Sequence, residues 1–145
     1  MIACRLRLHA NGEVSRPIAD FVGALSRKAE LTPRQSYRLR LAVDEIATNV
    51  ALHGYTGAYG VVDLEGGIDD ERVWVRIEDD APAFDPRTHD PGPRLAAPPA
   101  RREAGGLGLY LALRNVDAFT YDRVGGRNRN TLVILRTLPD GDTGD

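Results

Sequence analysis

The sequence predicts an α+β fold, a two-layer α/β sandwich in which helices cover one face of a mixed, mostly antiparallel sheet. Two observations lead to this prediction. Apolar residues recur with the period of strands in some segments and of helices in others, and the expected order is β-α-α-β-β-loop-α-β-β. The 145 residues suit one domain with one core, expected over 1–138 and followed by a polar tail at 139–145.

The chain should begin with a strand and a helix. Residues 2–9 alternate apolar and polar side chains, as a half-buried strand does. From about Ser15 to near Leu31, apolar side chains recur at helical spacing. A second helix is predicted from Thr32, a favourable N-cap, to about His53.

Two strands are expected next, at about 60–67 and 72–79, because the second of them alternates well. The stretch 80–104 is rich in Pro, Ala and Arg and has no sustained periodicity. A loop of that length inside a compact domain is usually functional or disordered.

The C-terminal part should hold a short helix and two strands. The glycines of 105–108 lead into a helix that ends near Val116. Strands at about 118–124 and 129–137 flank a turn at 125–128.

Composition excludes several classes of function. The formal net charge of -2 gives no broad electrostatic reason to expect nucleic acid or an anionic membrane as a partner. The single cysteine, Cys4, excludes an intramolecular disulfide and is expected to be an inert core thiol. No apolar run is long enough for a signal peptide or a membrane span, so we expect a cytoplasmic protein.

Glu45 and Asn49 form the first candidate constellation. They are four residues apart on the second helix and therefore share a face. A carboxylate beside an amide carbonyl suits Mg²⁺, or a base next to a metal ligand. Taken alone, such a pair is usually an ordinary solvated helix face.

Asp79 belongs to the second constellation, an acidic turn that runs from Glu78 to Pro86. A carboxylate at the mouth of a strand can accept a hydrogen bond from the exocyclic amine of adenine. The alternative is a plain polar turn that ends at Asp85-Pro86.

The third constellation is the run Gly105-Gly106-Leu107-Gly108-Leu109. Glycines directly before a helix let the backbone N–H groups and the helix dipole surround a phosphate. A simple junction between a loop and a helix would look the same.

In this order, the three groups resemble the motifs of the GHKL ATPases, the superfamily of gyrase, the heat-shock chaperone, histidine kinases and MutL. The resemblance implies the Bergerat fold and ATP-Mg²⁺ binding. Residues 41–49 with His53-Gly54-Tyr55 look like the N-box, 79–86 like the G1 box, 105–109 like the G2 box, 85–104 like the ATP lid, and 125–133 like the usual closing segment.

Within this superfamily the chain is most similar to the anti-sigma factor serine/threonine kinases of bacterial partner-switching systems. The His-Gly-Tyr end of the N-box and the Phe-Asp-Pro end of the G1 box are typical of that branch. The resemblance implies a protein-serine kinase whose substrate is a STAS-domain anti-anti-sigma factor. It also implies a sigma factor or equivalent output protein as partner, and a homodimer. Two alternatives stay open: a nucleotide-gated binding module with little catalysis, and weak ATP hydrolysis.

The resemblance also assigns roles to residues. Asn49 would be the main protein ligand of Mg²⁺, Glu45 the general base, and Arg16 a contact for partner proteins. Asp79 would recognise the adenine amine. The residues that would contact the nucleotide are Asn49, Asp79, Ala81, Ala83, Phe84, Gly105, Gly106, Leu107 and Gly108.

The sequence departs from the superfamily pattern in the G1 box. Ala81 and Ala83 stand where the superfamily generally has glycine, at least at the first position. We expect the β-carbon of Ala81 to restrict the backbone torsions and to crowd the adenine.

Overall fold

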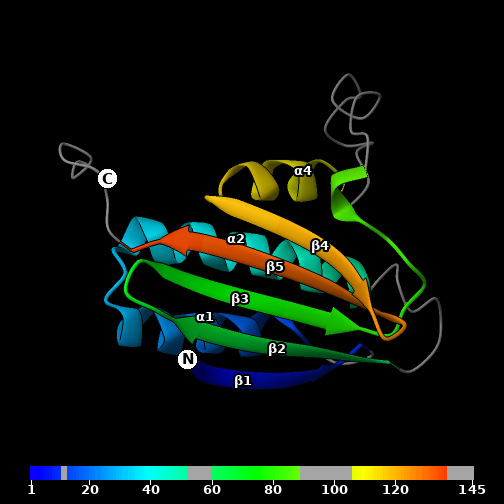
Figure 1. Ribbon diagram of the computed structural model, residues 1–145, viewed down its shortest axis with the longest axis horizontal. Coiled ribbons are helices and arrows are strands. Elements are labelled where there is room, and N and C mark those ends of the chain that lie inside the picture. The colour runs from blue at the N-terminus through cyan, green and yellow to red at the C-terminus, as the bar shows by residue number, and fades with distance from the viewer. Residues whose placement is uncertain (11–12, 52–59, 89–105, 137–145) are drawn as a thin grey trace.

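The computed structural model describes residues 1–10, 13–51, 60–88 and 106–136, and it confirms the α+β sandwich. Helices lie behind a sheet, with α4 along the edge formed by β4 (Figure 1). The elements are β1 (Ile2–His9), α1 (Ser15–Ala29), α2 (Pro33–Asn49), β2 (Val61–Ile68), β3 (Arg72–Asp79), a 3₁₀ turn η2 (Pro86–Thr88), α4 (Gly106–Arg114), β4 (Ala118–Val124) and β5 (Arg127–Leu135).

The five strands form one sheet in the order β1-β2-β3-β5-β4. All four pairings are antiparallel, so the sheet is not mixed in the part of the chain that is described. Short turns join β2 to β3 and β4 to β5, and a short turn can join only antiparallel neighbours. β3 therefore lies in the centre, paired with β2 on one side and β5 on the other.

The core lies between the sheet and the helices. Alternate residues of each strand face inward and pack against the apolar sides of α1, α2 and α4. Cys4 is half-buried against this core and forms no disulfide, as expected. The largest fully buried side chains include Ile18, Leu25, Leu39, Ile46, Leu64, Ile77, Leu109, Leu132 and Ile134.

Helix α1 ends at Ala29, two residues before the predicted end, because Glu30 adopts a left-handed conformation with φ 57°. The Leu31 N–H donates to the Ser26 carbonyl at 3.0 Å, which closes the last turn. Helix α2 then begins as predicted, with Thr32 and Gln35 forming a reciprocal capping box.

Helix α2 ends at Asn49, and a π-turn follows at the next two residues. The predicted end near His53, together with Gly54 and Tyr55, lies outside the described residues. So does the segment 89–105, which holds most of the expected lid. No helix in the described segments combines the length and the apolar character needed to cross a bilayer.

Strand β5 begins two residues earlier than predicted. Gly125 and Gly126 both have positive φ, at 59° and 79°, and they alone form the turn. Two positive φ values suit a two-residue hairpin, in which glycine is favoured at both positions. Arg127 and Asn128 therefore belong to the strand instead of the turn, and their side chains alternate between the two faces of the sheet.

Glu30 is the only non-glycine residue with positive φ among the residues that are described. We expect Glu30→Gly to stabilise the protein by about 1 kcal/mol, because glycine adopts this conformation without a steric penalty. Thermal and urea unfolding measure the change. Arg27→Gly, at an exposed right-handed position of the same helix, is the control and should destabilise by a similar amount. Destabilisation by Glu30→Gly would contradict the assignment.

Candidate functional site

Asp79, the last residue of β3, has no exposed surface. Its Oδ1 accepts hydrogen bonds from the Ala81 N–H at 3.0 Å and from the Asn128 side-chain amide at 2.8 Å. Its Oδ2 is buried and has no hydrogen-bond partner among the described residues. One oxygen of the carboxylate is thus fixed, and the other is a buried acceptor that is free for a donor.

Asn128 of β5 holds this corner together. Its side chain is only 3% exposed and lies opposite Asp79 in the register of β3 and β5. The amide nitrogen also donates to the carbonyls of Ala81 and Pro82, at 3.1 Å each. The amide oxygen accepts from the Phe84 N–H, the Tyr121 hydroxyl and the Arg123 guanidinium. One side chain therefore shapes the whole turn that follows β3.

From the sequence, Asn128 is predicted to lie in the turn at 125–128, with no role in the site. The signal that could have identified it is the Gly-Gly pair, which is enough for a two-residue hairpin turn and leaves Asn128 on the inward face of a strand.

Burial raises the pKa of the Asp79 carboxyl, and this effect exceeds the lowering by the bonds from Asn128 and the Ala81 N–H. The nearby Arg127 also lowers this pKa, and the neighbouring Asp80 raises it. The carboxylate is held in place, but its charge is less stable than in water.

The turn after β3 does not need glycine. Neither Ala81 nor Ala83 has positive φ, so the expected torsional restriction by the β-carbon does not arise. Ala81 is buried, and its backbone N–H and carbonyl both take part in the contacts to Asp79 and Asn128. Ala83 and Phe84 are exposed, and the Phe84 side chain is 40% exposed.

Glu45 and Asn49 are both half-buried on α2. Burial raises the pKa of the Glu45 carboxyl, and the adjacent negative charge of Asp44 raises it further. A β-carbon built on Gly108 of α4 would lie 2.5 Å from Glu45 Oε1. The Glu45 carboxylate therefore lies directly against the backbone of α4, in the space that a side chain at position 108 would enter. The fold brings the first and third constellations together here.

The other predicted residues are placed as follows. Gly106 and Leu107 open α4, whereas Gly105 lies outside the described residues. Arg16 is exposed in the first turn of α1. The hydroxyl of its neighbour Ser15 donates to Asp44 Oδ1 at 3.0 Å, which joins the start of α1 to the segment of α2 that carries Glu45.

These features fit an adenine nucleotide. The free Oδ2 of Asp79 can accept a hydrogen bond from an exocyclic amine, and Gly108 leaves no side chain at the start of α4. No group of three or more His, Cys, Asp or Glu side chains within the described ranges could hold a metal ion. A Mg²⁺ ion held by Asn49 would therefore take its other ligands from phosphates and water.

The site and fold agree with the comparison of the sequence with protein families. Residues 8–136 match the histidine kinase-like ATPase domain, so the chain belongs to this family of ATP-binding domains. A search among curated proteins found no match.

Asn128 should dominate the stability of this corner. We expect Asn128→Ala to lower the free energy of unfolding by about 2–4 kcal/mol, because several buried partners lose their bonds. Asn130→Ala is the matched control, since Asn130 faces the same side, is 2% exposed and has an Oδ1 without a partner among the described residues. It should cost about 1 kcal/mol or less. Equal losses in chemical denaturation would contradict the role of Asn128.

Asp79→Asn should stabilise the nucleotide-free protein at pH 7 by about 1 kcal/mol. The folded-state pKa of Asp79 lies above its ordinary value, so the ionised carboxyl opposes folding at neutral pH. This unfavourable contribution disappears as the pH falls and the carboxyl is protonated. The advantage of the variant should therefore shrink towards pH 3, and denaturation at a series of pH values measures it. A variant less stable than the wild type at pH 7 would refute this.

Proposed function

We propose that this domain is an ATP- and Mg²⁺-dependent protein-serine kinase that regulates a sigma factor by phosphorylating a STAS-domain anti-anti-sigma protein. The observation that carries the proposal is the position of Glu45. Its carboxylate lies against Gly108, one helical turn before Asn49, in a partly buried environment. A carboxylate held at a phosphate-binding glycine is suited to accept a proton from an attacking hydroxyl.

Bound Mg-ATP would supply the phosphoryl group, with the metal offsetting phosphate charge. The residues of the chain would perform the other tasks. Asp79 would orient the base through its free Oδ2, and Asn49 would hold the metal with its amide oxygen. Glu45 would take the proton from the substrate serine. The raised pKa of Glu45 favours this role, because a base is most effective when its pKa lies closer to the working pH.

The choice of partners rests on the resemblance of the N-box and G1 box to anti-sigma factor kinases. The placement of Arg16 supports it, because Arg16 is exposed and its neighbour Ser15 is bonded to Asp44, the residue next to Glu45. A partner protein bound at Arg16 would thus lie close to the proposed base. We also propose a homodimer and a cytoplasmic location, which the same resemblance implies.

Glu45→Gln should lower the rate of phosphoserine formation by roughly a hundredfold or more while leaving ATP affinity nearly unchanged, because only the base is lost. The assay combines labelled ATP, Mg²⁺ and a purified STAS-domain protein from the same genome, with calorimetry for ATP binding. Asp44→Asn is the matched control: it removes the adjacent carboxylate and should keep most of the activity.

Other outcomes would contradict either the role of Glu45 or the kinase function. Normal transfer by Glu45→Gln would show that the base assignment is wrong. ATP binding by the wild type without phosphoserine would favour a nucleotide-gated binding module. Release of inorganic phosphate without phosphoserine would favour hydrolysis.

A further inference from the structure

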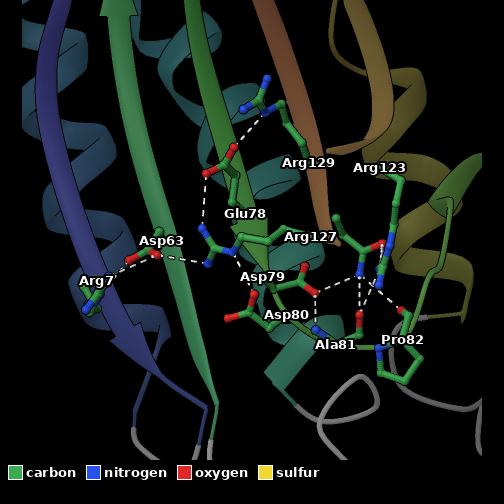
Figure 2. A network of polar contacts seen from close by, with 11 residues as sticks. Arg7, Asp63, Glu78, Asp79, Asp80, Ala81, Pro82, Arg123, Arg127 and Arg129 are labelled. Atoms are coloured by element: carbon green, nitrogen blue, oxygen red, sulfur yellow. Dashed lines mark hydrogen bonds and ion pairs between the residues drawn. The ribbon is translucent and has the colours of Figure 1, made fainter. Parts of the chain in front are cut away.

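A network of ion pairs covers the outer face of the sheet at the end that carries Asp79 (Figure 2). It runs from β1 across β2 and β3 to β5, and in it arginines from β1 and β5 pair with carboxylates from β2, from β3 and from the turn after β3. Its members are Arg7, Asp63, Arg127, Glu78, Arg129 and Asp80.

Arg127 is the centre of this network. Its Nε, Nη1 and Nη2 contact Asp80 at 2.8 Å, Glu78 at 3.3 Å and Asp63 at 3.1 Å. The three carboxylates come from β2, from β3 and from the turn that follows β3. The Arg127 side chain is 28% exposed, so its charge is partly shielded from solvent. One guanidinium thus joins strands and turn, which a planar group with several donors can do.

Contacts on both faces of the sheet fix the turn that follows β3. On the inner face, Asn128 binds Asp79, and on the outer face its neighbour Arg127 binds Asp80. Both bonds join the start of β5 to consecutive residues, the last of β3 and the first of the turn that follows it. The position of the Asp79 carboxylate therefore depends on hydrogen bonds on both faces of the sheet.

We propose that Arg127 is a positioning residue for base recognition, which holds the turn after β3 and the negative charge of Asp79 from the outer face of the sheet. This inference rests on the proposed function, because the base of ATP is what Asp79 would recognise. A protonated Asp79 would lose acceptor strength at Oδ2, so its charge matters for binding an amine.

The charged groups around Asp79 support this role. Within the described part of the chain, Arg127 lowers the pKa of Asp79 and Asp80 raises it. Glu78, the preceding residue, points to the outer face and is paired with Arg127 and Arg129. On the inner face, the Tyr121 hydroxyl and the Arg123 guanidinium of β4 donate to the Asn128 amide oxygen, and Arg123 also donates to the Ala81 carbonyl at 3.0 Å. Arg127 is thus a cation that favours the ionised form of this carboxyl.

The direct test is the titration of Asp79 in the nucleotide-free protein, followed by carboxyl carbon-13 NMR and assigned with Asp79→Asn. Arg127→Met should raise the pKa of Asp79 by roughly one unit, because an opposing charge is lost. Arg127→Lys should stay near the wild type, since it keeps the charge. Arg7→Met is the matched control: it removes an arginine of the same network that pairs with Asp63 of β2. An unmoved pKa in Arg127→Met, or an equal shift in Arg7→Met, overturns the proposal.

The second test is the affinity for Mg-ADP between pH 5 and 8, measured by calorimetry. The pH at which binding is half lost should rise by roughly the same one unit in Arg127→Met, and the affinities should converge at pH 8. An unchanged pH profile overturns the role in base recognition. If the wild type binds no ADP at any pH, that role falls with the proposed function, while the NMR titration still decides whether Arg127 acts on Asp79.

Asp80→Asn covers the case in which Arg127→Met does not fold. The Asp80 side chain is 58% exposed, so the change should be tolerated. It removes an anion beside Asp79 and should lower the pKa of Asp79, the direction opposite to that of Arg127→Met. General loosening of the turn would not produce opposite shifts, and a rise in both variants overturns the proposal.

Discussion

The register between β3 and β5 determines where each polar group at this end of the sheet lies. Asp79 is opposite Asn128, so the amide meets the carboxylate on the inner face. A slip of one residue would turn Asn128 outward and bring an arginine inward, because successive side chains of a strand alternate between faces. The shape of the turn after β3, the free oxygen of Asp79 and the outer network all depend on this one pairing.

The hydrogen bond from Asn128 engages Oδ1 of the buried Asp79 carboxylate and leaves Oδ2 without a partner among the described residues. A buried acceptor without a partner is unfavourable in the nucleotide-free fold, and the raised pKa of Asp79 reflects that. The sheet can hold such a group because β3 is central and is paired on both sides. Part of the stability of the sheet thus offsets the cost of this unpaired oxygen.

The order of elements could be predicted from the sequence, because apolar periodicity reports which faces are buried. Several boundaries could not be, and two of them depend on backbone torsions. Periodicity does not reveal that Glu30 adopts a left-handed conformation, nor that Gly125 and Gly126 alone make a turn. Because the predicted turn was two residues too long, the inward-facing position of Asn128 in β5 was not predicted. The motifs identified Glu45, Asn49 and Asp79 as candidates, but the contact between Glu45 and Gly108 required the packing of α2 against α4.

Burial raises the pKa of both Asp79 and Glu45, yet the two carboxylates are suited to different tasks. For Asp79, hydrogen bonds from Asn128 and the Ala81 N–H oppose the effect of burial and fix one oxygen in place. For Glu45, the neighbouring charge of Asp44 adds to the effect of burial. A carboxylate fixed by hydrogen bonds is suited to recognise a ligand. A carboxylate whose pKa is raised both by burial and by a neighbouring negative charge is suited to accept a proton. The first carboxylate depends on contacts with β5 and the second on the packing of α2 against α4, so the two roles proposed for them can be tested separately.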